Sequence, residues 1–158
     1  MIRGARGFTL IELVVTLAII GLLAVTAMPV AQMMAKREKE AELRESLRQI
    51  RGALDAYRVA SQTGHIKTEL GASGFPPDLR ALYIGVEDAA SEKKSMLYFL
   101  RRVPRDPFYP DGSVPAEETW GLRSYASPPD APEPGEDVFD VYSLAPGKGL
   151  NGVNYHEW

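Results

Sequence analysis

The first third of the chain has the pattern of one long helix with two different halves. Residues 8–28 are apolar, with Glu12 as the single charged side chain among them. A helix of about 20 residues spans roughly 30 Å, the thickness of the apolar core of a bilayer. The pattern therefore predicts a membrane-crossing segment, and the basic residues before it, Arg3 and Arg6, favour a cytoplasmic N-terminus.

The second half of this helix combines both charge signs with one apolar stripe. The stripe has the period of an amphipathic helix and consists of Leu43, Leu47, Ile50, Leu54 and Tyr57. We expect this face to pack on a globular head. Gly64 is a stop signal, so the predicted helix runs from Phe8 to about Gln62. Pro29 lies inside it and should bend or locally open it, because proline removes one backbone hydrogen bond.

From Gly64 onward the sequence is rich in Gly, Pro, Asp and Tyr and has few periodic runs. The stretch "SGFPPDLRALYIG" predicts a short helix, and "SEKKSMLYFLRRVP" predicts a second one that ends at Pro104. "RSYAS" and "DVFDVYSLAP" have the composition of strands. The proline-rich acidic loop "PPDAPEPGED" between them predicts a long hairpin connection.

Composition limits the functions of such a head. The formal net charge is −3 at pH 7, so no basic surface for nucleic acid is indicated. The chain has no cysteine, and therefore no disulfide holds the head together. His65 and His156 are the only histidines, and no serine stands in a nucleophile motif. The sequence predicts a protein that is not an enzyme.

The apolar segment can be interpreted as a cleaved signal peptide or as a plain membrane anchor, and each interpretation must account for Glu12. A cleaved signal peptide would have the basic start and a small-residue site at Val25–Ala27, but the apolar run is too long for one. A plain membrane anchor explains the length and the orientation. It gives no reason for Glu12, whose burial in the bilayer would cost on the order of 3 kcal/mol.

The stretch "GFTLIELVV" resembles the type IV prepilin signature, which pilins share with the pseudopilins of type II secretion. The resemblance implies that a prepilin peptidase cleaves after Gly7 and N-methylates Phe8, the new first residue. Glu12 would then pair with the Phe8 amine of a neighbouring subunit, because a buried carboxylate needs a positive partner. In the alternative, Glu12 bonds the amine of its own chain and caps its own helix. Pilin-like proteins also carry a proline near Pro29, which implies that this section stretches or melts during packing.

The head resembles that of the major pseudopilin of type II secretion in "FPP", "RRVPRDPF", "WGLRSY" and "DVYSLAPG". The implied fold class is α+β, with the long N-terminal helix packed on a small antiparallel β-sheet and a C-terminal loop closing over it. The implied parts are a leader peptide at residues 1–7, a transmembrane and assembly helix at 8–34, its amphipathic continuation at 35–63 and a globular head at 64–158.

The resemblance implies a structural subunit of a type II secretion pseudopilus, a periplasmic filament that helps to drive protein secretion. Its partners would be further copies of the chain, the prepilin peptidase, the inner-membrane assembly platform and minor pseudopilins. The chain would cross the inner membrane once, with its C-terminal head in the periplasm. Two alternatives stay open: a major or minor subunit of a type IV pilus, and a monomeric membrane-anchored periplasmic adaptor.

The subfamily typically binds one calcium ion in the C-terminal loop. Here the carboxylates that could serve as ligands are Asp140 and Glu157, whereas calcium usually takes six to eight oxygens and more than one carboxylate. We therefore expect no metal cofactor, and we expect Trp158, Tyr155 and Trp120 to hold the loop by apolar packing instead.

Overall fold

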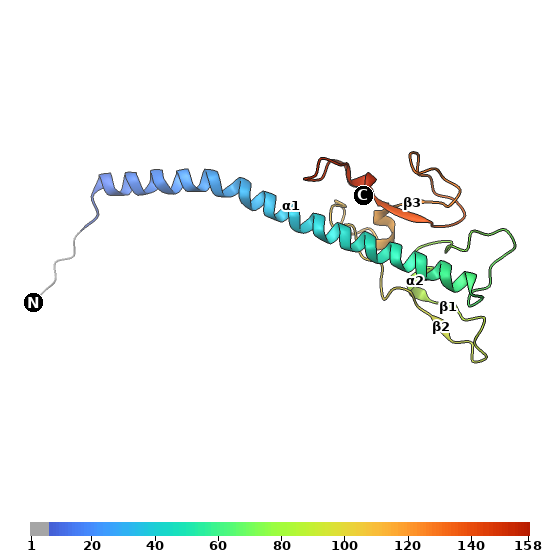
Figure 1. The fold of residues 1–158 in the computed structure, drawn as a ribbon. Helices are drawn as coiled ribbons and strands as arrows, with labels where there is room; N and C mark the ends of the chain where they lie inside the picture. The colour runs from blue at the N-terminus through green and yellow to red at the C-terminus, as the bar shows by residue number, and fades with distance from the viewer. Residues whose placement is uncertain (1–6) are drawn as a thin grey trace, which may run out of the picture. The chain divides into compact units, whose positions relative to one another are not determined.

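The computed structural model describes residues 7–158, without the side chain of Thr26. The predicted leader therefore lies outside the described residues, except for Gly7. The chain divides into two compact units, one that ends at Glu38 and one that comprises Lys39–Trp158. Helix α1, Leu10–Gln62, contributes to both (Figure 1). The predicted long helix is thus confirmed, with a start two residues later than expected.

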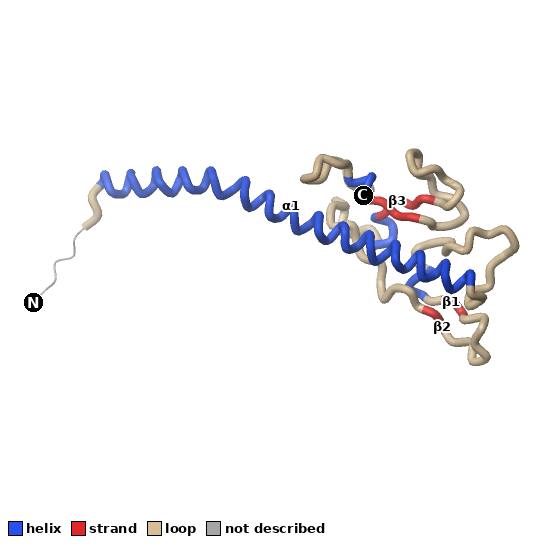
Figure 2. The backbone as a smooth tube through the Cα atoms, viewed as in Figure 1, coloured by secondary structure: helices blue, strands red, loops and turns tan. Residues whose placement is uncertain are grey.

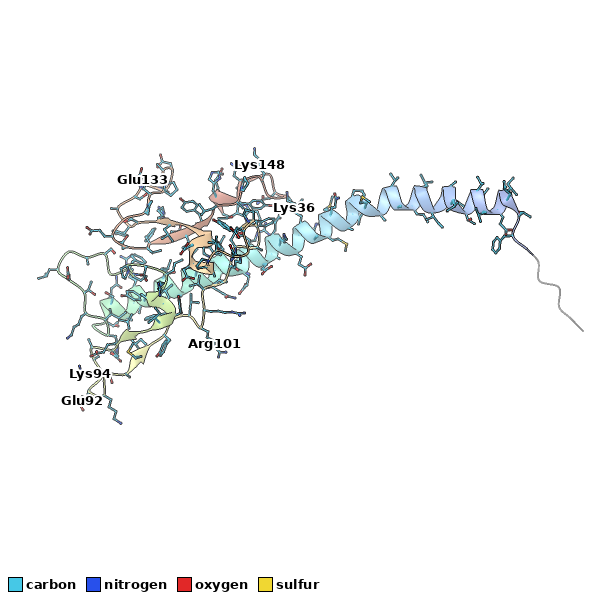
Figure 3. All side chains as sticks on the ribbon, turned by 180° about the vertical axis from the view of Figure 1, so that it is seen from behind. Lys36, Glu92, Lys94, Arg101, Glu133 and Lys148 are labelled. Carbon is cyan, nitrogen blue, oxygen red and sulfur yellow. The ribbon has the colours of Figure 1, made fainter. Side chains whose placement is uncertain are left out.

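In the first unit, α1 is an apolar helix without a covering layer. Every described side chain from Gly7 to Ala35 is exposed, and the side chains project on both sides of the ribbon (Figure 3). An 18-residue window of α1 has a mean hydropathy of 2.5 and is 0% buried. Its length and composition suit a single membrane crossing. The helix continues through Pro29.

In the second unit, α1 supplies one wall of the core. All five residues of the predicted stripe are buried, with exposed fractions between 0% and 7%. The helix ends as Gly64 adopts a φ of +81°. Two hydrogen bonds close this end, from Gly64 N–H to the Ser61 carbonyl at 3.2 Å and from His65 N–H to the Ala60 carbonyl at 2.9 Å. These are the paired bonds of a Schellman motif, so the predicted stop at Gly64 is confirmed.

The head contains two separate antiparallel ribbons (Figure 2). In the first, β1 (Val86–Glu87) pairs with β2 (Met96–Leu97) beside the short helix α2 (Ala81–Ile84). In the second, β3 (Trp120–Arg123) pairs with β4 (Asp140–Ser143) in the register Trp120↔Ser143. The 3₁₀ turns η1 (Ala116–Thr119) and η2 (Tyr155–Glu157) flank this pair in sequence. The expected α+β class and the hairpin between the two last strands are confirmed.

The second short helix predicted before Pro104 is wrong. Its apolar residues alternate as in a strand: Met96 and Tyr98 are 45% and 64% exposed, whereas Leu97 and Phe99 pack against the core. Met96 and Leu97 form β2, and the N–H groups of Phe99 and Leu100 both donate to the Leu82 carbonyl at 2.9 Å. A short apolar run does not reveal its period, so long-range pairing decided its conformation.

The strand predicted at "RSYAS" is displaced toward the N-terminus. The observed strand β3 ends at Arg123, and a turn follows. The reason is the Asp137 carboxylate, which accepts hydrogen bonds from the Ser124 hydroxyl at 2.7 Å and from the Tyr125 N–H at 2.8 Å. The bond to the Tyr125 N–H takes a backbone donor that is then not free to continue the ladder.

Candidate functional site

The predicted processing junction precedes the first turn of α1. Gly7, Phe8 and Thr9 are outside the helix, and Phe8 is 78% exposed. The Gly7–Phe8 peptide bond is therefore not engaged in helical structure. An enzyme that cleaves an extended peptide would not need to unwind α1 to reach this bond.

Thr9 and Glu12 form a reciprocal cap on the N-terminus of α1. The Thr9 N–H donates to Glu12 Oε2 at 3.5 Å, and the Glu12 N–H donates to Thr9 Oγ1 at 3.3 Å. This is the capping box, in which a threonine at the cap and a glutamate three residues later satisfy two backbone donors. The carboxylate also lies at the positive end of the helix dipole. Glu12 thus has a role within its own chain.

Two roles were considered for Glu12, pairing with the amine of a neighbouring subunit and capping its own helix, and the observed cap concerns the second. Its own-chain partner in this structure is the backbone of Thr9, before any new amine exists at Phe8. The pairing with a neighbouring subunit concerns the processed chain and stays a prediction. The residue that sequence reasoning missed is Thr9, although the threonine-x-x-glutamate spacing before an apolar run was a readable signal.

Pro29 lies inside α1 and is exposed. Because proline has no N–H, the carbonyl of Val25 loses its usual helical partner. The bend or local opening predicted for this position rests on that missing bond and stays a prediction.

In the second unit, the buried carboxylate of Glu40 holds the C-terminal segment, which we define as residues 144–158. Glu40 is 3% exposed, and its Oε1 accepts hydrogen bonds from the Leu150 N–H at 2.8 Å and from the Tyr155 hydroxyl at 3.1 Å. Burial, together with the hydrogen bond and the negative charge of Glu40, raises the pKa of Tyr155 to about 12. Glu40 was absent from the predicted site residues, because a charged residue next to the apolar stripe has the pattern of a solvated one.

The aromatic residues expected to hold the C-terminal segment divide into two groups. Tyr155 is 3% exposed and stacks on Phe108 with ring centroids 4.4 Å apart, and Trp158 meets Tyr155 edge-on at 5.2 Å. The Trp158 indole also lies so close to Gly149 that an added Cβ would approach it to 2.4 Å. Trp120, in contrast, lies on β3 and donates its indole N–H to the Pro104 carbonyl at 2.8 Å. Apolar packing of the segment thus involves Tyr155 and Trp158.

The two predicted calcium ligands are engaged in separate polar networks. Asp140 Oδ1 contacts Arg51 Nε at 2.7 Å, and Asp140 Oδ2 lies 3.6 Å from the Arg123 guanidinium. The Glu157 carboxylate accepts from the Asn154 amide and lies 3.6 Å from His156 Nε2. Within residues 7–158 no three His, Asp or Glu side chains are grouped closely enough to hold a metal ion. This set of donors does not fit calcium.

The two histidines have structural neighbours rather than a catalytic arrangement. His65 Nδ1 lies 2.9 Å from Asp88 Oδ1, and the Ala89 N–H donates to the His65 carbonyl at 2.7 Å. The hydrogen bond from His65 lowers the pKa of Asp88. These contacts tie the turn after α1 to the end of β1.

Comparison with known proteins agrees with these features. Residues 2–28 match the family described as "Prokaryotic N-terminal methylation motif". Over 141 residues, which cover 84% of this chain and 91% of the relative, the chain is 28% identical to the type II secretion system core protein G of Klebsiella pneumoniae. No solved structure gives a significant match.

Pilins and pseudopilins are structural, non-enzymatic proteins, as expected from the sequence. The chain thus carries a type IV pilin-like N-methylation motif and is a distant homologue of the major pseudopilin of type II secretion.

Proposed function

We propose that this chain is a structural subunit of a type II secretion pseudopilus. The observation that carries the proposal is the apolar half of α1, which leaves every described side chain exposed directly after the Gly7–Phe8 junction. Such a helix is stable in a bilayer, and outside it only if neighbouring chains cover it. Each leucine or isoleucine that a neighbour buries outside the bilayer would stabilise the assembly by about 1.5–3 kcal/mol.

Maturation removes residues 1–7 and leaves Phe8 as an N-methylated terminus. Support comes from the basic leader, the motif match over residues 2–28 and the position of the junction outside α1. The cleavage converts the amide nitrogen of Phe8 into a positive amine. That new charge stands one turn before the Glu12 carboxylate, at an end of the helix whose dipole disfavours cations.

Assembly uses this new amine. In the processed chain, Glu12 keeps its own-chain cap with Thr9 and still has acceptor capacity, because a carboxylate accepts several hydrogen bonds. The Phe8 amine of a neighbouring subunit satisfies that capacity and removes the penalty of an unpaired charge among apolar side chains. The pair sets the register between subunits.

The chain crosses the inner membrane once, and its head, residues 64–158, lies in the periplasm. Residues 8–34 form the membrane and assembly helix and residues 35–63 its amphipathic continuation. The partners are copies of the same chain, the prepilin peptidase, the inner-membrane assembly platform and minor pseudopilins. Support comes from the one helix within residues 7–158 that is long and apolar enough to cross a bilayer, and from the similarity to core protein G along most of both chains.

The test separates the charge of Glu12 from its cap. Glu12→Gln keeps the capping box, which tolerates glutamine at this position, but has no charge for the neighbour's amine. Thr9→Val is the matched control, because it removes the hydroxyl of the cap and keeps the carboxylate. Both variants are expressed as the full chain with the prepilin peptidase and the assembly platform, and subunit contacts are measured by crosslinking.

We expect Glu12→Gln to insert and to be processed, yet to lose at least tenfold in crosslinked oligomers, whereas Thr9→Val keeps most of them. Normal oligomers of Glu12→Gln together with failure of Thr9→Val would reduce Glu12 to a helix cap. A wild-type chain that stays monomeric would favour the membrane-anchored adaptor, and filaments on the cell surface at native expression would favour a type IV pilus.

A further inference from the structure

Arg51 gathers oxygen atoms from both ends of the C-terminal part of the head. Its Nε donates to Asp140 Oδ1 at 2.7 Å, at the start of β4. One terminal nitrogen donates to the Val141 carbonyl at 3.1 Å and to the Trp158 backbone oxygen at 2.7 Å. One side chain of α1 therefore binds oxygens that are separated along the chain by the whole of residues 142–157.

These acceptors have the chemistry of a cation site. One carboxylate and two backbone oxygens converge on one positive group, as they would on a hard metal ion. The guanidinium suits the position because it presents five N–H donors in a planar fork and stays charged. The Arg51 and Asp140 side chains are 38% and 28% exposed, so this cluster is partly withdrawn from water.

We propose that the Arg51 guanidinium is the cation that closes the C-terminal segment onto α1, and that this closure needs no bound metal. The carboxylate of Asp140 is already committed, since Arg51, the Val141 N–H and Arg123 all contact it. A divalent ion at the same carboxylate would stand beside two guanidinium groups and be repelled by both. The proposal concerns the unit Lys39–Trp158 alone and holds whether or not the chain assembles.

A second attachment lies on the same helix and carries the opposite charge. Glu40 binds Leu150 and Tyr155, three turns of α1 before Arg51, or about 16 Å along the axis. Between them, the Arg44 guanidinium lies 4.2 Å from the centre of the Trp158 ring. Three charged side chains of α1 thus contact the C-terminal segment at three successive places.

The first experiment needs no variant. The full chain in detergent micelles is melted in excess chelator and in millimolar calcium chloride, with tryptophan fluorescence as the readout. Trypsin cleavage after Lys148, an exposed residue of the C-terminal segment (Figure 3), measures opening of that segment under the same conditions. We expect equal melting temperatures and equal cleavage rates. A fall in melting temperature on chelation, reversed by calcium, would overturn the proposal.

The second experiment removes the guanidinium. Arg51→Ala leaves Asp140 beside two backbone oxygens that have lost their donor. Arg48→Ala is the matched control, because Arg48 is 69% exposed, lies on the same helix and pairs with Glu45 at 2.5 Å. We expect Arg51→Ala to lower the melting temperature by at least about 5 °C and to accelerate cleavage at Lys148 about tenfold or more, with Arg48→Ala close to wild type. Equal behaviour of the two variants would refute the proposal.

A third variant distinguishes a multidentate cation from a simple ion pair. In Arg51→Asp combined with Asp140→Arg, the ion pair is restored with reversed polarity, but the carboxylate at position 51 cannot donate to Val141 or Trp158. We expect this pair to remain as open to trypsin as Arg51→Ala. Full recovery in the reversed pair would show that Arg51 acts through Asp140 alone. This arm remains decisive if Arg51→Ala fails to fold, since recovery of folding by the reversed pair would equally contradict the proposal.

Discussion

Burial of Tyr155, together with the hydrogen bond from its hydroxyl to the Glu40 carboxylate, makes the unit Lys39–Trp158 sensitive to alkali. The pKa of Tyr155 is raised to about 12 from an unfolded value of 10.0, because burial and Glu40 favour the protonated phenol. A raised pKa means that the folded state binds more protons than the unfolded state between these two pH values. The stabilisation is therefore complete below pH 10 and is lost as the pH rises toward 12.

We predict that the melting temperature of wild type falls more steeply than that of Tyr155→Phe between pH 10 and pH 12. The variant starts lower at pH 8, because Glu40 loses a hydrogen bond, and the two curves then converge. Tyr57, whose pKa is also raised by burial and by Asp78, titrates in both proteins and is removed by the comparison. A constant difference between the two melting temperatures across this range would contradict the role of Tyr155.

Among elements, α1 is the one that the sequence specified best. Its apolar stripe followed from spacing alone, and its end followed from Gly64, whose positive φ suits glycine. Two glycines of this element allow a matched test, since Gly52 lies in the helix and Gly64 just after it. An added Cβ meets no other atom within 4 Å at either position, so only backbone conformation differs.

We predict opposite effects for the two glycine substitutions. Gly64→Ala forces alanine into the left-handed region and should lower the free energy of unfolding by about 1 kcal/mol. Gly52→Ala should raise it by up to about 1 kcal/mol, because alanine is the better helix former. Urea unfolding of the full chain in one detergent measures both. Equal changes in the same direction would mean that Gly64 does not act as the helix stop.

The strands were predicted less well than α1, and the physical reason differs between strands. β1 and β2 have two residues each, too few to display a period, and they exist because Val86 and Leu97 meet in the folded head. β3 was displaced because Asp137, distant in sequence, captures the backbone of Tyr125. β4 was predicted within "DVFDVYSLAP" because this stretch has the aromatic and β-branched content of a strand, and its residues alternate between half-buried and buried positions.

The candidate site residues also differ in how well the sequence predicts them. Gly7, Phe8 and Glu12 follow from a local motif, so the sequence alone indicates them. The attachments of the C-terminal segment join Glu40 and Arg51 on α1 to residues about 90 to 115 positions later, and no local pattern carries that information. Whether Asp140 could serve as a calcium ligand could be judged only after Arg51 was found beside it.

At the scale of the whole molecule, the two units differ in how much of their apolar surface they bury within the chain. The unit Lys39–Trp158 buries its own apolar core and holds its own C-terminal segment. The described part of the first unit leaves its apolar side chains to a bilayer or to other chains. This difference is what the proposed function requires of a subunit that is held in a membrane before it assembles.

The measurement that tests this account most directly is the mass of the mature chain, purified from its native membrane. The account predicts a protein that begins at Phe8 and is one methyl group heavier than the unmodified sequence 8–158. Such a product keeps the whole apolar helix for assembly. A chain cleaved after Ala27 would have discarded that helix, and a chain that still begins at Met1 in an assembly-competent membrane would never have formed the Phe8 amine. Either result would contradict the proposed function.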